Sequence, residues 1–457
     1  MFERLTGIRL AALGRLGRTA MLVSLLALLA ALAVSVSDVI KYPGEDLRPK
    51  VTGARAMLLG LDPYTYEAGP DTPEELQDYT RVFAHLTRVT YPPTLLALYA
   101  PLSPLPFRAQ RYFWAAAEWV ALLATLLLLT RSLGSQRARV LFFTLACIFF
   151  AGGDFWRLHV ERGQYYAFVL LLLAGGSFLL LRGRHGPWVQ GLPIGFAIAL
   201  RPTLAVMIPA LWLLRLRKPA VSAAGTAALL VALTLPLAGI RGWLQYQRSV
   251  AMLERTILGD KETIRSLGQP YRPPPVIEGH DYSQTAYLRS YTANTSFSWI
   301  VPRLLQLRDR EAWMAISKVL AFACAAAFLI AALVLGAARR SLRTRAALAI
   351  VAALMVDDFL ILRVSYADVL LLAPLALLLP ALIRQRTPPL FAALLLGGLV
   401  LGANLLLVWT PIGWLGPIVR SAAVMLGLVC SCLWLSSFAQ PGHRQPLRLR
   451  EESEEQK

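Results

Sequence analysis

Cysteine and histidine are both scarce in this chain. Its 457 residues include four cysteines, all in apolar runs, and five histidines. The cysteines form neither a disulfide framework nor a zinc-ligand spacing, so core packing is the expected role of each thiol. His159 and His280 stand apart from any spaced set of ligands. We therefore expect no metal site.

Charged residues are also few, at 16% of the chain, whereas hydrophobic residues make up 56%. Soluble globular chains carry about a quarter charged residues. The apolar residues gather in uncharged runs, and the longest are 19–37, 163–181, 219–240, 319–338, 387–419 and 421–442. Most match the roughly 20 residues that cross a membrane, and shorter runs fill the gaps. We expect an all-α polytopic membrane protein with about 12 transmembrane helices.

Basic residues outnumber acidic ones by 46 to 27, which gives a formal net charge of +19. In a soluble chain this charge would suggest a nucleic-acid partner. Here the cations cluster at the ends of apolar runs, in short loops after every second run. The positive-inside rule then places these loops and both termini in the cytosol. We expect the lipid bilayer, and no nucleic acid, as a partner.

A single integral membrane domain is predicted over residues 1–440, followed by a charged, disordered cytosolic tail at 441–457. Two long polar segments, 39–111 and 241–311, interrupt the apolar runs and fall on the extracytoplasmic side. The chain has no evident internal repeat. It also lacks a phosphate-cradling glycine loop and a nucleophile elbow, so nucleotide-driven pumping and serine hydrolysis have no support.

The first polar segment holds the best candidate for chemistry. Asp46 lies just beyond the first apolar run, with Arg48 and Lys50 close behind it. A carboxylate at the membrane surface could deprotonate an acceptor hydroxyl, and cations beside it would keep it ionised and could bind a phosphate leaving group. An ordinary solvated salt bridge is the alternative. Asp38 and Glu45 are rival carboxylates.

A second candidate divides two apolar runs that are each short for a membrane crossing. Arg201, followed by Pro202, predicts two short helices that meet near the outer interface. Charge is costly at that depth, which makes a phosphate group a reasonable partner. Snorkelling of Arg201 at a helix end is the simpler alternative.

Further polar residues lie at the outer ends of predicted helices. Gln164 could hydrogen-bond a sugar or cap a helix. Asp357 and Asp358 could bind a cation, although a local salt bridge to Arg363 is the simpler interpretation. Asn294 begins a glycosylation acceptor pattern, which we interpret as polar contacts before a helix.

The order of these motifs resembles glycosyltransferase family 87, whose members are polyprenyl-phosphate-sugar-dependent membrane enzymes of the GT-C class. The stretch DLRPKVTGARAMLLGLDPY at 46–64 looks like the opening signature of the family. The motifs that follow, in the family's order, are Tyr91-Pro92-Pro93, Gly163-Gln164, Arg201-Pro202, and Asn294 with Ser296. The similarity extends from about residue 38 to residue 385.

The resemblance implies inverting transfer of mannose, or a related hexose or pentose, from a polyprenyl monophosphate to a hydroxyl of a glycan or glycolipid. It makes Asp46 the catalytic base. The donor-phosphate candidates become Arg201, Arg48 and Lys50, and the sugar or acceptor candidates become Tyr64, Tyr91, Gln164, Glu161, Asn294 and Ser296. No metal or cofactor is expected, because guanidinium groups can neutralise a monophosphate. The implied location is a prokaryotic plasma (inner) membrane, with the active site extracytoplasmic.

The chain departs from the family pattern at two places. The family usually has lysine where Arg201 stands. It often has Trp-x-His-Tyr near the tenth span, where this chain has Tyr366, Ala367 and Asp368. The missing histidine leaves the identity of donor and acceptor open.

Two other functions also remain open at this point. A lipid-linked sugar flippase or secondary transporter would be expected to show repeats and ionisable residues near span centres. Only Glu118 and the break at Arg201 indicate that class. A non-catalytic scaffold for envelope assembly would bind a partner through the proline-rich outer segment and would tolerate loss of Asp46.

Overall fold

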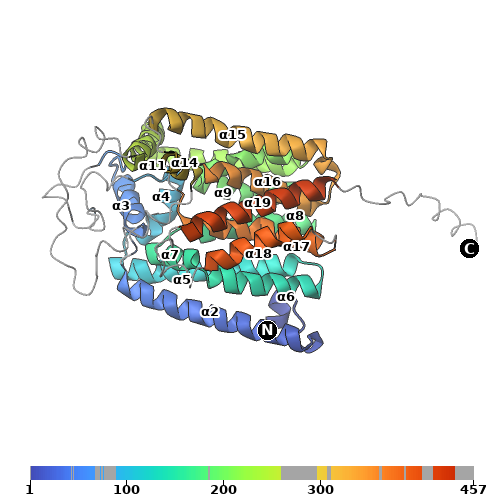
Figure 1. Cartoon of the computed structure of the whole chain (residues 1–457). Helices are drawn as coiled ribbons and strands as arrows, with labels where there is room; N and C mark the ends of the chain where they lie inside the picture. Colours follow the sequence, from blue (N-terminus) through green and yellow to red (C-terminus); the bar gives the residue numbers. More distant parts are fainter. Residues whose placement is uncertain are drawn as a thin grey trace, which may run out of the picture.

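The protein is a bundle of helices that run side by side along one axis (Figure 1). The computed structural model describes residues 2–42, 44, 46–66, 73, 76, 89–183, 186–258, 296–305, 310–359, 363–384, 388–403 and 415–437. No β-strand occurs within these ranges. Glu45, His280, Asn294 and the predicted tail at 441–457 lie outside them. The all-α prediction is therefore confirmed for the described part of the chain.

Apolar helices form the length of the bundle. They are α2 (Arg15–Lys41), α5 (Phe107–Ser132), α8 (Tyr166–Arg182), α9 (Pro187–Leu200), α11 (Arg217–Leu258), α15 (Arg310–Val334), α16 (Leu342–Asp358), α17 (Leu372–Arg384), α18 (Pro389–Ala403) and α19 (Leu415–Ser437). Among the described residues, six helices are long and apolar enough to cross a membrane. A seventh span results if Gln136–Ala151 and Asp154–Arg162, which are bent by 56°, cross together. The expected number of about 12 spans stays a prediction.

The helices face two different environments, as a membrane bundle requires. Leu22, Leu26 and Leu29 form a stripe on α2 that no other helix covers. In contrast, every residue of α16 from Ala346 to Leu354 is buried against neighbouring helices. Exposed leucines on an outer helix are expected when lipid acyl chains surround the helix, because contact with lipid costs an apolar side chain no free energy.

Short helices gather at one end of the bundle, at the left of Figure 1. They are α3 (Leu47–Leu58), α4 (Pro93–Tyr99), α7 (Asp154–Arg162) and α14 (Phe297–Leu304). Pro92 and Pro93 begin α4, where proline is well tolerated because the first helical N–H groups have no partner within the helix. This end contains Asp46.

The opposite end carries basic side chains that bind the carbonyls of helix C-termini. Arg139 donates to Gly7 O at 2.7 Å, Arg345 to Leu214 O at 3.2 Å, and Arg340 to Ser436 O at 2.9 Å. Arg343 donates to Ser132 O. The last carbonyls of a helix lack partners within it, so these arginines satisfy them. Basic loops that are distant in sequence thus share one face; that this face is cytosolic stays a prediction.

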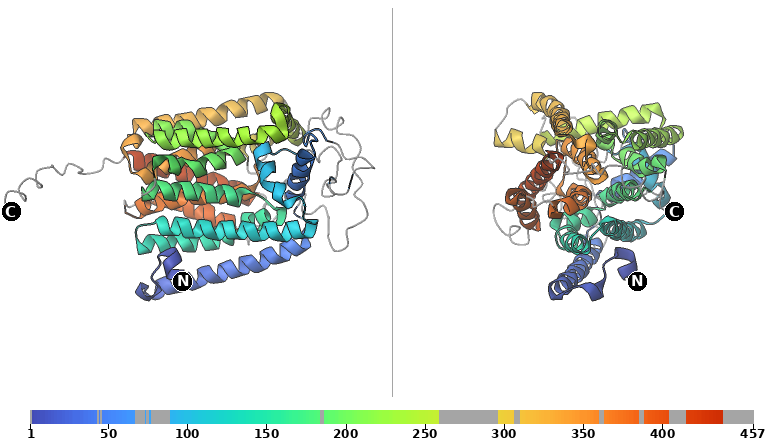
Figure 2. Two further views of the ribbon diagram at one scale, coloured as in Figure 1. Left: turned by 180° about the vertical axis from the view of Figure 1, so that it is seen from behind. Right: turned by 90° about the vertical axis from the view of Figure 1, so that its right-hand side faces the viewer.

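Helix α11 is broken at Gly239, whose φ of 64° and ψ of 171° are open only to glycine. Beyond this break the helix turns, and its last part lies across the end of the bundle beside α3 and α4 (Figures 1 and 2). Tyr246 in this part packs against Tyr64, with ring centroids 6.0 Å apart. Ser249 donates to Val89 O at 2.8 Å.

Candidate functional site

Asp46 lies at the start of α3 and is largely buried. Its backbone N–H donates to Arg162 O, and its carboxylate accepts two hydrogen bonds from the Arg162 guanidinium, 2.5 Å from Nε and 3.1 Å from Nη2. Gln164 donates to the same carboxylate. A bidentate guanidinium and an amide donor stabilise the ionised form. Asp46 is therefore part of a buried joint between α3 and α7.

Gly163 makes this joint possible. It ends α7 in the left-handed region, at φ 69°, where residues other than glycine are strained. A Cβ atom on Gly163 would lie 2.7 Å from the Cβ of Leu47, in the first turn of α3. Glycine thus allows the end of α7 to approach the start of α3 closely. The chain bends at Gly163, and Arg162 and Gln164 lie on either side of this bend.

Lys50 follows Asp46 by one helical turn and is fully buried. Its ammonium donates to Asp46 O at 2.5 Å, to Gln164 Oε1 at 3.3 Å and to Gly163 O at 3.4 Å. It also lies over the Tyr91 ring, 4.5 Å from the centroid. Residues i and i+4 share a helix face, so Lys50 and Asp46 bind the same amide.

Arg48 points to different surroundings. It lies two residues after Asp46, and residues at this spacing do not face each other on a helix. Its guanidinium stacks over the Phe107 ring at 4.7 Å, near the start of α5. Of the two cations after Asp46, Lys50 is the one whose described contacts join the Asp46 and Gln164 cluster.

The Asp62 to Tyr64 motif supports Tyr91. Asp62 accepts a hydrogen bond from the Tyr64 backbone N–H at 3.0 Å, and the Tyr64 hydroxyl donates to Tyr91 O at 2.7 Å. Burial raises the pKa of the Tyr64 phenol, so it remains a donor at neutral pH. Tyr64, predicted as a sugar or acceptor contact, thus acts on the loop that carries Tyr91.

Arg201 lies where α9 ends and the short helix η6 (Pro202–Val206) leads into α10 (Met207–Leu213). The predicted pair of short helices is confirmed, but the side chain does not snorkel. Arg201 is buried, and its Nη2 lies 2.6 Å from Asp357 Oδ1. Its Nη1 donates to the hydroxyls of Tyr166 at 2.6 Å and Tyr165 at 3.2 Å. The cation predicted to bind a phosphate already has a carboxylate partner.

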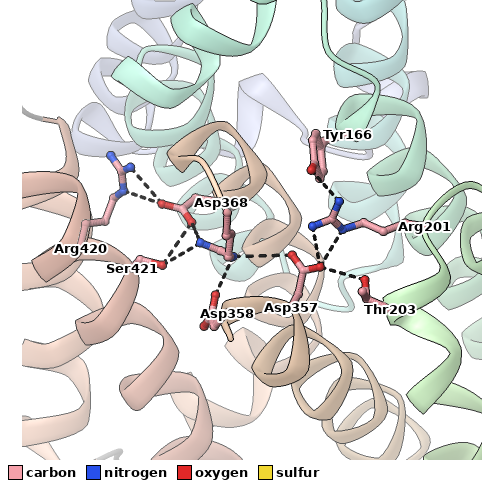
Figure 3. A network of polar contacts seen from close by, with 9 residues as sticks. Tyr166, Arg201, Thr203, Asp357, Asp358, Asp368, Arg420 and Ser421 are labelled. Atoms are coloured by element: carbon pink, nitrogen blue, oxygen red, sulfur yellow. Dashed lines mark hydrogen bonds and ion pairs between the residues drawn. The ribbon is translucent and has the colours of Figure 1, made fainter. Parts of the chain in front are cut away.

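Asp357 belongs to a larger network of three arginines and three aspartates (Figure 3). Arg363 Nε lies 2.6 Å from Asp358 Oδ1 and 3.6 Å from Asp357 Oδ2, which confirms the predicted local salt bridge. Arg363 Nη1 and Arg420 Nη2 bind Asp368 at 2.7 Å and 2.9 Å. The network joins η6, α16, α19 and the short helix η8 (Ser365–Leu371). Asp368, at the place of the missing histidine, is one of its anions.

Tyrosine rings connect Lys50 with Arg201. The Tyr91 and Tyr165 rings meet edge to face, with centroids 6.2 Å apart. Lys50 Nζ lies 5.8 Å from the Tyr165 ring, and the Tyr165 hydroxyl accepts from Arg201. Asp46 and Arg201 therefore belong to one polar region, with Tyr91 and Tyr165 between them.

A buried pair that sequence reasoning missed lies behind the bend at Gly163. Glu118 Oε1 on α5 lies 3.3 Å from His159 Nδ1 on α7, and both side chains are inaccessible to solvent. His159 Nε2 accepts the Ala167 N–H at 3.1 Å, which leaves Nδ1, on the side of Glu118, as the ring nitrogen that can carry a proton. Glu118 therefore packs against a buried imidazole of the fold, which weakens its use as a sign of a transporter.

Two further contacts from α5 hold the same bend. Arg111 donates to Glu161 O at 3.0 Å, and Trp114 Nε1 donates to Gln164 O at 3.1 Å. Glu161 was predicted as a sugar or acceptor contact, and its backbone is thereby part of the support for Gln164. Ser296 precedes α14, and its carbonyl accepts the Ile300 N–H at 3.0 Å. Within the described residues, no three His, Cys, Asp or Glu side chains cluster in a way that could hold a metal ion.

Comparison with known protein families gives a match over the middle of the chain. A sequence model of glycosyltransferase family 87 matches residues 90–365, which is more than half of the chain. The matched region contains Gln164, Arg201 and Asp357, whereas Asp46 lies before it. No curated protein and no solved structure matches the chain. The chain therefore belongs to glycosyltransferase family 87 and is a membrane glycosyltransferase.

Proposed function

We propose that the protein transfers a sugar, mannose or a related hexose or pentose, from a polyprenyl monophosphate to a hydroxyl acceptor, with Asp46 as the base. The observation that carries the proposal is the buried Asp46 carboxylate, held between Arg162 and Gln164 beside the Lys50 ammonium. One carboxylate and two cations at the same point supply what such a transfer needs: a proton acceptor and counter-charges for a departing phosphate.

The reaction is a single displacement. The acceptor oxygen attacks the anomeric carbon, its proton passes to Asp46, and the bond from that carbon to the phosphate oxygen breaks with both electrons going to the phosphate. Attack from the side opposite the leaving group inverts the anomeric centre. The acceptor hydroxyl donates a hydrogen bond to the Asp46 carboxylate. This bond either adds to those from Arg162 and Gln164 or takes the place of one of them.

Lys50 is the best supported of the three cations proposed for the donor phosphate. Its ammonium lies against Asp46 O and Gln164 Oε1. Arg162 joins it as a candidate, because an arginine that holds a carboxylate in two bonds can hold a phosphate in the same geometry. Arg201 lies beyond Tyr165, and a phosphate there would share its guanidinium with Asp357.

The remaining features of the proposal follow from this placement. Gln164 and Tyr91 border the Asp46 and Lys50 pair and would contact the sugar or the acceptor, which is a glycan or glycolipid. The end of the bundle with α3, α4 and α7 would face away from the cytosol across the plasma membrane, and both termini would be cytosolic. Cations of the protein, rather than a metal ion, would neutralise the phosphate.

The test presents purified protein with a panel of polyprenyl-phosphate sugars and follows the release of free polyprenyl phosphate with and without candidate acceptors. Acceptor-dependent release that disappears in Asp46→Asn supports the proposal and identifies the donor. Absence of release from every donor, together with movement of lipid-linked sugar across a reconstituted bilayer, would overturn it in favour of a flippase.

A further inference from the structure

The part of α11 beyond Gly239, residues 240–258, has two distinct faces. The inner face is anchored to the site region through Tyr246, which packs on Tyr64, and through Ser249, which donates to Val89 O. The outer face exposes Arg241, Arg248 and Arg255. These arginines are spaced by seven residues, which brings them to the same side of a helix.

Apolar side chains share this outer face with the arginines. Ile240 is 72% exposed and Leu244 is 52% exposed. A face in water would not be expected to expose two large aliphatic residues within one turn, and a face in hydrocarbon would not carry three cations. The headgroup level of a membrane accommodates both the aliphatic side chains and the arginines. There the aliphatic part of each arginine lies along apolar surface while its guanidinium group reaches lipid phosphates.

The orientation of residues 240–258 is also the one expected for a helix at the headgroup level of a membrane. This helix lies across the end of the bundle, so it runs parallel to the plane of a membrane that the bundle crosses (Figure 2). The end of α3 and the turn after it add further exposed leucines at this end of the bundle, Leu58 at 49% and Leu59 at 65%. The chain from this turn leads within a few residues to Tyr64, which packs on the helix.

The charge of the helix is almost entirely of one sign. Glu254 is the one acidic residue in 240–258, and it is buried and paired with Lys318 at 2.7 Å. Within 240–258 the exposed charged side chains of the outer face are therefore all cations. We propose that this face, formed by Ile240, Arg241, Leu244, Arg248 and Arg255, binds the headgroups of anionic phospholipids and fixes the depth of the site in the membrane.

The test places a fluorescent label on the face itself. Leu244→Cys is introduced into a chain whose four native cysteines are replaced by alanine, labelled with bimane, and reconstituted in equimolar phosphatidylcholine and phosphatidylglycerol. Bromine, a contact quencher, is carried on the acyl chains of one lipid or of the other. Brominated phosphatidylglycerol is expected to quench about twofold more than brominated phosphatidylcholine, because each arginine near the surface attracts anionic lipid. The difference is expected to shrink at high salt.

Two variants decide whether the three arginines cause the difference. Arg241→Gln/Arg248→Gln/Arg255→Gln is expected to make the two brominated lipids quench equally. The matched control, Arg131→Gln/Arg137→Gln/Arg182→Gln, removes three exposed arginines outside this helix and is expected to leave the difference intact. Equal quenching in the parent chain, or an unchanged difference in the first variant, would overturn the proposal. Neither result depends on the proposed transfer reaction.

Discussion

Lys50 and Asp46 stand one turn apart at the start of α3, and both bind the side-chain amide of Gln164, which follows the end of α7. The amide oxygen accepts from the ammonium while the amide nitrogen donates to the carboxylate. This arrangement fixes the orientation of the amide and holds one cation and one anion on the same side of α3. The site therefore depends on the relative position of two helices that are distant in sequence.

Arg162 is predicted to position the base. Arg162→Gln removes both guanidinium bonds to Asp46, so transfer should fall about 10- to 100-fold because small displacements of a reacting group are costly. Arg162→Lys should recover only part of this loss, since an ammonium cannot donate in the same bidentate geometry. Steady-state transfer rates measure both effects.

The control for this pair is Arg157→Gln. Arg157 lies on the same helix and pairs with Asp38 at 2.7 Å, but its side chain is 42% exposed. Arg157 is partly solvated and its ion pair is with Asp38 rather than Asp46, so transfer should change less than about threefold. A larger loss from Arg157→Gln than from Arg162→Gln would contradict the assignment.

Gly163→Ala should disrupt the joint between α3 and α7. It imposes strain at φ 69° and also a clash with Leu47. Gly183→Ala is a matched comparison, because φ is 61° there and no atom lies within 4 Å of the added methyl group. We expect about 1 kcal/mol of strain in each, and a further loss of stability and transfer in Gly163→Ala alone. Melting temperatures in detergent and transfer rates distinguish the two; equal effects would show that the contact with Leu47 is unimportant.

Lys50 and Arg48 differ in their contacts, which predicts different kinetic effects. Lys50→Met should raise the KM for the lipid-linked donor about 10- to 100-fold, because a hydrogen bond to a charged group is lost in a buried site. Arg48→Met should have a smaller effect on KM, since Arg48 stacks on Phe107. Donor titrations of both variants check this order, and the reverse order would assign the phosphate to Arg48.

The role of Arg201 can be separated into a structural and a binding part. Arg201→Gln leaves Asp357 in a buried network with one cation fewer, which should cost about 3 to 5 kcal/mol of stability. Arg201→Gln/Asp357→Asn restores the charge balance and should recover most of the melting temperature. If transfer recovers as well, Arg201 is structural; if transfer stays low in the stable double variant, Arg201 also binds the donor.

Local sequence patterns predicted the parts of the site that local geometry controls. Arg201-Pro202 breaks an apolar run, and the structure has two short helices meeting there. Asp357, Asp358 and Arg363 are close in sequence, and their ion pair follows from that closeness. The sequence also predicted Lys50 beside Asp46, but the helix that brings the two to one face is a finding of the structure.

Contacts that depend on helix packing could not be predicted in this way. Arg162 lies 116 residues from Asp46, and no periodicity relates the two. The same holds for Glu118 with His159, and for Asp368 with Arg420. A buried cation such as Arg201 indicates that a partner exists, but the choice between a phosphate and Asp357 requires the position of α16.

The assignment of Asp46 as the base is tested most directly by measuring single-turnover transfer in Asp46→Asn, with a donor that the unaltered protein accepts. Binding of the donor to the same variant is measured separately. Asparagine keeps the size of the side chain and removes the proton acceptor. We predict a rate loss of about 10²- to 10⁴-fold, the usual contribution of a general base, with donor affinity changed less than about threefold. Near-normal transfer by Asp46→Asn would show that another group accepts the proton.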